Sequence, residues 1–358
     1  MKIKVLFLLC GIIFACAGND TKESRKVTQH DLERKYATGV VLIKNTYYYS
    51  IDFDTNLTIY FTGVNDNGQI EGATFDVDEV DPITLYGTGF FVSDDGIIAT
   101  NSHVACPSFS TKDARSAIVD AFNSLAEQAQ DIINQQNERL GELRLLIDAG
   151  NNEYINDYQK LTSTRDNYQK LINIVKRLNT SECEYARHCN IGVALNNTHV
   201  TNTSDFMSCV TIADDSEHDL ALIQLKSQET PKNAHIFKAS STKKTRNGKS
   251  ETDYDDTSRK SRKSISGETL YMIGFNLGPQ LALTKEGIKA QITKGEVTQD
   301  TDEDHFMYSI PSLHGSSGAP VINSRGKLVA VNYAGLSQTQ NFNFGIKSEH
   351  LKKLLEEY

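Results

Sequence analysis

The sequence predicts a mainly β fold of antiparallel strands, into which one long pair of helices is inserted. Short apolar runs separated by Asn, Asp and Gly occur on both sides of the middle of the chain, which is typical of strands and turns. Between residues 110 and 178, apolar residues instead recur every three or four positions, which is typical of helices. The chain has 358 residues and a formal net charge of -9. This length suits one or two packed cores. Because the chain is acidic and has no basic stripe, it is a poor candidate for nucleic-acid binding.

Residues 1–16 have the features of an export signal, because two lysines precede an apolar run that is too short to span a bilayer. Ile13–Cys16 resembles a lipobox, which would make Cys16 the lipidated first residue of the mature protein. Ordinary cleavage before Gly18 is the alternative. Polar residues 17–35 suit a tether. We therefore expect an exported protein that is a periplasmic, outer-membrane or cell-surface lipoprotein, anchored through the lipid on Cys16, or is otherwise secreted.

The first strands follow the tether. Apolar bursts that predict strands lie at residues 38–44, 57–62 and 73–77. Gly87–Val92 predicts another strand, Ser93–Gly96 a turn, and Ile97–Ala105 a second strand that ends near His103. This pattern predicts a β-hairpin that carries His103 at its rim.

The segment 108–180 is expected to be an inserted helical hairpin. Its apolar residues continue at a spacing of three and four on both sides of a turn at Ala149–Asn152. The two helices, of about 27 to 38 residues each, would bury these apolar faces against one another in the manner of a coiled coil.

The strand pattern resumes after the hairpin. His218–Leu225 places the Asp219 carboxylate at the mouth of a strongly apolar strand. Residues 240–267 are polar and mixed in charge, which indicates a flexible surface loop. Further strands are expected at residues 269–275, 280–283, 289–297 and 306–310, and a short amphipathic helix at residues 348–357.

The turn Leu313–Pro320 is built of small residues and leads into an apolar run. Gly315 and Gly318 can adopt the backbone angles of a sharp corner and expose Ser317 on it. The backbone N–H groups of Gly315 and Ser317 could then converge to form an oxyanion hole. Together with His103 and Asp219, this serine completes a set of base, orienting acid and nucleophile in the chain order His, Asp, Ser.

Three segments carry a resemblance to a known family. Thr100–Val104, Asp219–Ile223 and Gly315–Pro320 look like the three catalytic segments of trypsin-like serine peptidases of the chymotrypsin fold. The resemblance extends over residues 36–104 and 191–358 and is greatest to the bacterial branch with HtrA (Deg) and V8-like enzymes, although no PDZ domain is expected.

The resemblance implies one protease domain, residues 36–358, made of two antiparallel β-barrels. His103 and Asp219 would lie on the first barrel and Ser317 on the second, with the active cleft between them. The implied activity is that of a serine endopeptidase, which hydrolyses peptide bonds of protein or peptide substrates through an acyl-enzyme intermediate. The alternative is an inactive protease-fold protein that holds a partner with its helical hairpin.

The family pattern also implies a substrate pocket lined by Pro311, Asn332, Tyr333 and Ala334. None of these carries a carboxylate, which favours a small or aliphatic substrate residue over Lys or Arg. His314 offers the alternative of binding an acidic side chain.

The hairpin separates His103 from Asp219 by 116 residues, whereas a compact enzyme of this kind separates them by about 45. Two roles stay open for it: a partner-docking or substrate-gating arm beside the cleft, or a self-packing insertion without a role in the chemistry.

Four cysteines remain after the signal peptide. They allow three pairings, of which we favour Cys183–Cys189 and Cys106–Cys209, while buried free thiols are the alternative. No metal-binding spacing occurs among the nine histidines and the cysteines, so neither a metal nor a cofactor is expected.

Overall fold

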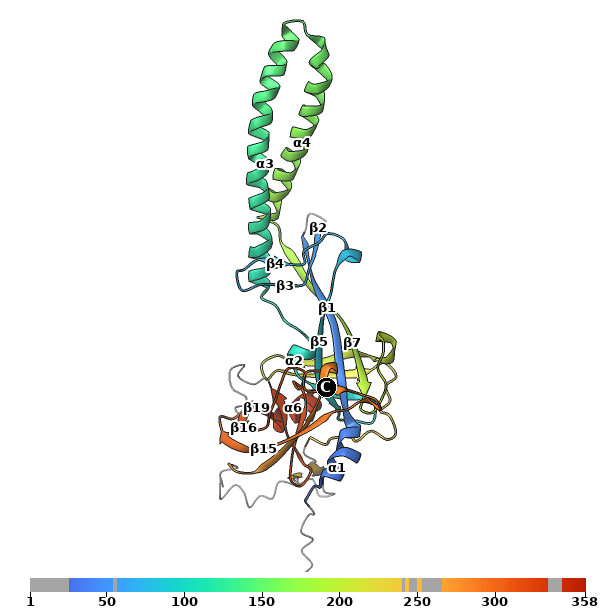
Figure 1. Ribbon diagram of the computed structural model, residues 1–358. Helices are drawn as coiled ribbons and strands as arrows, with labels where there is room; N and C mark the ends of the chain where they lie inside the picture. Colours follow the sequence, from blue (N-terminus) through green and yellow to red (C-terminus); the bar gives the residue numbers. More distant parts are fainter. Residues whose placement is uncertain (1–25, 54–56, 240–241, 245–249, 253–265, 334–342) are drawn as a thin grey trace, which may run out of the picture.

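The computed structural model describes residues 26–53, 57–239, 242–244, 250–252, 266–333 and 343–358. Two β-barrels pack side by side, and a pair of long helices projects away from them (Figure 1). The predicted signal peptide with Cys16, residues 17–25 of the tether and most of the 240–267 loop lie outside the described residues.

Six strands close the first barrel, in the order β1-β5-β6-β9-β8-β7 and back to β1, and β2 extends the sheet beside the far end of β1. These strands are β1 (Val40–Phe53), β2 (Leu57–Phe61), β5 (Ile83–Phe91), β6 (Ile97–Thr100), β7 (Cys183–Leu195), β8 (Met207–Asp215) and β9 (Leu220–Leu225).

Six further strands form the second closed barrel, in the order β12-β15-β16-β19-β18-β17. They are β12 (Thr269–Gly274), β15 (Gln291–Asp300), β16 (His305–Tyr308), β17 (Pro320–Asn323), β18 (Leu328–Tyr333) and β19 (Asn343–Lys347), and the helix α6 (Ser348–Glu357) follows. Two antiparallel barrels were the expected architecture, and this prediction is confirmed.

Short elements connect these strands. They are the helices α1 (Gln29–Arg34), α2 (Ser102–Ala105) and α5 (Pro279–Ala282), the 3-10 turns η1 (Tyr36–Gly39), η2 (Val77–Glu79), η3 (Asn152–Tyr154) and η4 (Thr203–Asp205), and the strands β3 (Gly63–Val64), β4 (Ile70–Glu71), β10 (Thr242–Lys244), β11 (Ser250–Thr252), β13 (Leu283–Thr284) and β14 (Gly287–Ile288).

The strand β9 shows why some strands of the first barrel are apolar along their whole length. Successive side chains of a strand point to opposite faces. Leu220 and Leu222 face a cluster shared with the second barrel, whereas Ala221, Ile223 and Leu225 face the interior of the first barrel. All six residues of β9 are therefore buried, although an antiparallel strand with one face in water would alternate.

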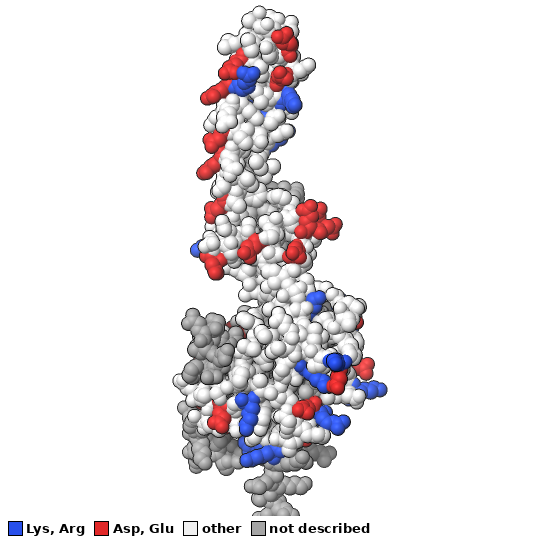
Figure 2. Space-filling model, in the orientation of Figure 1, with Lys and Arg blue, Asp and Glu red and all other residues white. Residues whose placement is uncertain are grey.

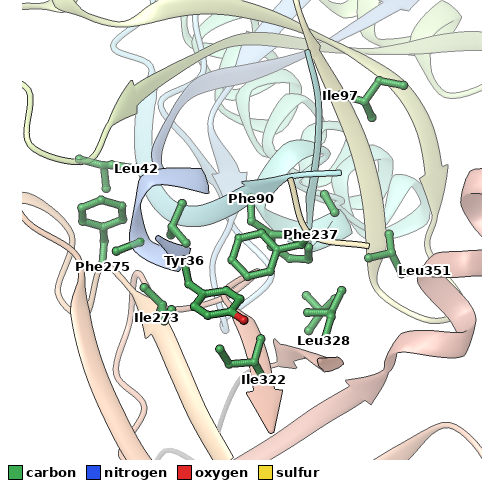
Figure 3. Packing of buried hydrophobic residues seen from close by; sticks show 14 of the residues in the cluster. Tyr36, Leu42, Phe90, Ile97, Phe237, Ile273, Phe275, Ile322, Leu328 and Leu351 are labelled. Atoms are coloured by element: carbon green, nitrogen blue, oxygen red, sulfur yellow. The ribbon is translucent and has the colours of Figure 1, made fainter. Parts of the chain in front are cut away.

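The cluster between the barrels joins them into one unit (Figure 3). Leu42 and Phe90 of the first barrel pack there with Ile273 and Ile322 of the second and with Leu351 of α6. Because one apolar core is continuous across the interface, residues at the rims of the two barrels are held in fixed relative positions.

The projecting arm consists of α3 (Thr111–Asp148) and α4 (Ile155–Leu178), so the predicted helical hairpin is confirmed. The Ser110 side chain caps α3 by accepting a hydrogen bond from Asp113 N. Ala129, Ile133 and Ile172 form a buried cluster between the two helices. The outer surface of the arm carries mixed charges, and a group of acidic side chains lies at its base (Figure 2). Within the described ranges, no helix is both long and apolar enough to cross a membrane.

A second cluster attaches the arm to the first barrel, and we call it the base cluster. It joins the far ends of β1 and β2 to the near ends of both long helices. Its members are Tyr49, Ile51, Phe53, Ile59, Phe61, Ala114, Ile118 and Leu178. The arm is thus anchored by packed aromatic and aliphatic side chains.

The predicted disulfide Cys183–Cys189 is wrong, because both residues are free thiols on the single extended strand β7. Cys183 lies opposite Phe53 of β1, and Cys189 lies opposite Tyr47. Six residues of extended strand span about 20 Å, whereas a disulfide needs Cα atoms within about 7 Å.

The predicted disulfide Cys106–Cys209 is wrong as well, because both residues are buried free thiols. The Cys106 Sγ lies 3.8 Å from Thr211 Oγ1, and the Cys209 Sγ lies 3.8 Å from the Met207 carbonyl. Burial raises the pKa of Cys209 to about 12, so its thiol stays protonated and packs as a small apolar group.

Candidate active site

His103 lies on the short helix α2, at the edge of the first barrel. The sequence predicted a strand running through this residue, but β6 ends at Thr100. Asn101 then adopts an extended conformation, and the chain turns into the helix. The turn brings His103 beside the start of β9, which pairs with β6 through Ala221 and Thr100.

Asp219 binds His103 at two points. Its Oδ2 lies 2.7 Å from the Nδ1 of His103, and its Oδ1 accepts a hydrogen bond of 2.9 Å from the backbone N–H of the same residue. A carboxylate in this position places the ring proton on Nδ1. The lone pair of Nε2 is then left free to accept a proton.

Neighbouring polar groups fix the position of Asp219. This residue has a φ of 51°, an uncommon backbone conformation for a residue other than glycine. The Nδ2 of Asn101 donates to the Asp219 carbonyl at 2.9 Å and holds the turn in place. Nearby, the hydroxyl of Ser102 donates to Asp214 Oδ1 at 2.5 Å. The two residues that precede His103 are therefore bonded to Asp219 and to the end of β8.

Ser317 lies on a turn that needs both of its glycines. Gly315 has a φ of 92° and Gly318 a φ of 84°, which L side chains rarely adopt. A Cβ atom at Gly318 would lie 2.2 Å from the Thr88 carbonyl oxygen and 2.3 Å from the Thr100 hydroxyl. The turn can therefore approach the first barrel only because residue 318 lacks a side chain.

Thr88 of β5 connects this turn to the first barrel. Its backbone N–H donates to the Ser317 carbonyl at 2.8 Å, and its hydroxyl donates to the Gly315 carbonyl at 2.7 Å. Its own carbonyl accepts from the Thr100 hydroxyl, three residues before His103. Ser317 and His103 are thus attached to the same part of the first barrel. Among the described residues, no hydrogen bond joins their side chains, and such bonds often tighten only when substrate is bound.

The backbone of the turn leaves two N–H groups free. Ser316 N donates to the Leu313 carbonyl and Gly318 N to the Asn332 carbonyl, at 3.0 Å each. The Gly315 and Ser317 N–H groups have no acceptor in the part of the chain that the structure describes. The preceding His314 carbonyl accepts from Leu277 N. Two free N–H groups, one of them on Ser317 itself and the other two residues before it, are what an oxyanion hole requires.

Asn332, which was expected in the substrate pocket, is fully buried behind the turn. Its Nδ2 donates to Ser312 Oγ at 3.1 Å and to the Ser316 carbonyl at 3.0 Å, and its Oδ1 accepts from the Tyr308 hydroxyl at 2.6 Å. Burial raises the pKa of Tyr308, so this phenol stays protonated and remains a donor. In this arrangement Asn332 holds the turn together.

Two of the other predicted pocket residues lie in the part of the chain that the structure describes. Pro311 is exposed and Tyr333 is half-buried, while Ala334 lies outside the described residues. Sequence reasoning missed Thr88, Asn101 and Tyr308, which position the site. Single Thr, Asn and Tyr side chains are too common in a sequence to suggest such roles.

Comparison with known proteins finds a family model and solved structures that resemble this chain. The family model described as trypsin-like peptidase domain matches residues 180–331, which include Asp219 and Ser317 but not His103. No curated protein matches the sequence. Among solved structures, the serine endoprotease from Yersinia pestis is similar, with 13% sequence identity and a TM-score of 0.43. That match covers 92% of this chain and 66% of the other chain.

The family match and the fold point to the same class of domain. Residues 180–331 match the model of the trypsin-like peptidase domain, and the closed barrels have the architecture that the resemblance implied. The recognition of a trypsin-like peptidase fold from three short segments is confirmed.

Proposed function

We propose that the protein is a serine endopeptidase in which His103, Asp219 and Ser317 form the catalytic triad. The observation that carries this proposal is the double contact of Asp219 with His103, at 2.7 Å and 2.9 Å. It fixes both the position of the ring and the nitrogen that carries the proton. His218 makes the same kind of double contact with Asp215. His103 differs because its segment is joined, through Thr100 and Thr88, to the turn that carries Ser317.

The residues then act in sequence. The Nε2 of His103 takes the proton of the Ser317 hydroxyl while Oγ attacks the carbonyl carbon of the peptide bond. When the tetrahedral intermediate collapses, the C–N bond breaks and His103 gives the proton to the leaving amine. Water, activated by the same imidazole, hydrolyses the acyl ester and releases Ser317. Asp219 stabilises the imidazolium at both stages.

The free N–H groups of Gly315 and Ser317 would bind the oxyanion of the tetrahedral intermediate. Removal of one such donor from a related site costs about 3 to 4 kcal/mol of transition-state stabilisation. Asn332 and Thr88 support these donors by holding the two sides of the turn, so they are positioning residues.

A fluorophosphonate probe tests the proposal, because it reacts with activated serine hydroxyls. The wild-type chain should be labelled, and mass spectrometry of its peptides should find the adduct on Ser317 and not on the neighbouring Ser316. Ser317→Ala should abolish labelling, and Asp219→Asn should slow it by on the order of 10³- to 10⁴-fold. A folded wild-type chain that is not labelled would favour the inactive partner-binding alternative.

We further propose that the enzyme prefers small or aliphatic substrate residues. The family pattern assigns Pro311, Asn332, Tyr333 and Ala334 to the pocket, and none of these residue types carries a carboxylate that would attract Lys or Arg. Asn332 contributes only from behind the turn, where it is buried. Cleavage of a peptide library would test this preference. Cleavage after Asp or Glu would instead support a role for His314, which is exposed beside the turn.

We also propose that the protein is exported and lipid-anchored through Cys16. The support is the sequence of residues 1–16 alone. Mass spectrometry of the mature protein isolated from membranes should find an acylated Cys16 at the N-terminus. An unmodified N-terminus at Gly18 would instead indicate secretion.

A further inference from the structure

A cavity of about 510 Å³ lies at the base of the arm, between the first barrel and the start of α3. Its volume falls within the range of about 300–1,000 Å³ that is usual for ligand sites. It is lined by the middle of β1, the hairpin of β3 and β4, the stretch 108–110 and the first turn of α3. The cavity therefore exists only because the arm is attached to the barrel at this place.

Aromatic rings line part of this cavity. The ring of Tyr49 lies 5.7 Å from that of Tyr47 and 4.4 Å from that of Phe109, measured between centroids. Tyr49 is buried, and its hydroxyl donates to the Pro107 carbonyl at 3.3 Å. Tyr47 and Phe109 are half-buried, so part of each side chain stays accessible from the cavity. This wall can pack against an apolar group of a ligand.

Two carboxylates also line the cavity, and both residues are exposed. Asp66 lies in the turn between β3 and β4, and Asp113 lies in the first turn of α3. The cavity thus combines an apolar wall, which is partly buried, with negative charge where it opens to solvent.

Local hydrogen bonds fix the backbone on which these carboxylates stand. In the turn that carries Asp66, the Oδ1 of Asn65 accepts from the backbone N–H groups of Asn67 and Gln69, at 3.0 Å each. At the start of α3, Ser110 Oγ accepts from Asp113 N at 3.2 Å. Because both segments are already ordered, a ligand does not have to order them when it binds.

No positive side chain balances these two carboxylates. Within the described ranges, neither of them forms an ion pair. Exposed carboxylates farther along the arm differ, because Glu142 pairs with Arg139 and Asp148 with Arg144. The cavity therefore offers two negative charges to a ligand.

The surface near the cavity is acidic as well. Phe75 packs against Phe122 of α3 with the ring centroids 6.2 Å apart. The exposed residues Asp76, Asp78 and Glu79 follow Phe75 directly, so they too lie at the base of the arm. A group of acidic side chains is visible there in Figure 2. The negative potential of such a surface attracts cations and repels anions.

A lysine or arginine side chain matches this combination of groups. Its methylene stem can lie against Tyr47 and Phe109 while its charged end reaches Asp66 and Asp113. A small inorganic cation would leave the aromatic wall in contact with water, and an anion would meet two like charges.

We propose that this cavity binds a lysine or arginine side chain of an extended polypeptide. Phe109 follows His103 by six residues, which span at most about 22 Å. A polypeptide with a basic residue in the cavity could therefore reach the catalytic site as well. The choice of a polypeptide rests on the proposed function, because a peptidase acts on such chains. The preference for a cation rests on the cavity alone.

The test is peptide binding by the full chain carrying Ser317→Ala, which cannot cleave the probe. The probe is a Gly/Ser peptide with one central Lys and a neutral fluorophore, and its fluorescence anisotropy is followed as protein is added. A peptide with Arg in place of Lys should bind as well. Norleucine has the stem without the charge, and diaminopropionic acid has the charge on a shorter stem. Each should bind at least about fivefold more weakly.

Variants test the two carboxylates. Asp66→Asn combined with Asp113→Asn should weaken binding of the Lys peptide by about 4- to 25-fold, because two exposed ion pairs are lost. Asp78→Asn combined with Glu79→Gln is the matched control, since it removes the same charge outside the cavity. It should weaken binding by less than about twofold, because solvent and salt screen more distant charges. Equal midpoints of urea unfolding for all these proteins would exclude misfolding.

Three results would overturn the proposal. They are a parent that does not bind the Lys peptide, a norleucine peptide that binds as tightly, and a control pair that weakens binding as much as the cavity pair does. n-Butylammonium supplies the cation and the stem without a peptide. If it displaces the probe at the same concentrations as unlabelled Lys peptide, the occupant is a free amine and not a polypeptide. None of these outcomes depends on fluorophosphonate labelling, so this inference and the proposed function can fail separately.

Discussion

Gly318 allows the turn of Ser317 to approach the first barrel, and its replacement tests that packing. Gly318→Ala would place a methyl group against the Thr88 carbonyl at a φ of 84°. We expect it to lower the free energy of unfolding by at least about 2 kcal/mol, because strain of about 1–3 kcal/mol adds to the steric overlap. Urea unfolding of Ser317→Ala protein with and without the change measures the effect.

Gly141 is the matched control for that substitution. It lies inside α3, and a Cβ atom there would meet nothing within 4 Å. Gly141→Ala should therefore raise the free energy of unfolding by up to about 1 kcal/mol through helix propensity. Equal effects of the two substitutions would show that space and backbone angle at Gly318 do not matter.

His235 should make stability depend on pH. Burial, with a smaller contribution from Lys35, lowers its pKa to about 4, and its ring packs edge-on against Tyr36 at 4.7 Å. Between the unfolded pKa of about 6.5 and pH 4, the unfolded chain binds a proton that the folded chain does not. The free energy of unfolding should therefore fall as the pH falls through this window.

The variant His235→Phe keeps the ring and removes the titration. Its free energy of unfolding, measured with urea between pH 7 and pH 4, should fall less steeply than that of the parent. Parallel curves for the two proteins would mean that other groups cause the acid sensitivity.

Individual residues differ in how far the sequence could predict them. His103, Asp219 and Ser317 stand in short motifs whose order matches a known arrangement, so the sequence was enough to propose them. Their supporting contacts could not be predicted, because Thr88 approaches the turn only through barrel packing.

At the scale of elements, the base cluster determines how firmly the arm is attached. Leu178 is fully buried there, at the last residue of α4. Leu178→Ala should lower the free energy of unfolding by about 2–5 kcal/mol, through lost burial and the cavity that remains. Leu145→Ala in α3, where the side chain is 73% exposed, should change it by no more than about 0.5 kcal/mol. Thermal and urea unfolding would measure both, and similar effects would contradict this account.

The elements themselves were predictable where the pattern is strong. The spacing of three and four predicted both long helices, but it did not show which apolar residues of α3, such as the buried Ile133, face α4. A straight helix drifts by about 20° per heptad against a strict repeat, so the contact line moves along the sequence. The prediction of a Cys183–Cys189 disulfide was wrong because the pattern did not reveal that β7 runs unbroken from Cys183 to Cys189.

At the scale of the whole molecule, the arm and the barrels should be separable. The cluster of Ala129, Ile133 and Ile172 lies between the two helices, whereas the base cluster lies nearer the barrel. Replacing residues 126–170 by a short Gly/Ser linker should leave both barrels folded, with a thermal midpoint within about 5 °C of the parent. Fluorophosphonate labelling should persist. Lost labelling in a folded, shortened chain would give the arm a part in the chemistry.

The strand β1 runs without a break for 14 residues, from the wall of the first barrel to the base cluster. Its length is about 45 Å, and β7 accompanies it along nearly the whole distance. Neither of these two strands is interrupted between the barrel and the base cluster. A lateral force on the tip of the arm would therefore be transmitted along these two paired strands to the first barrel, which holds His103.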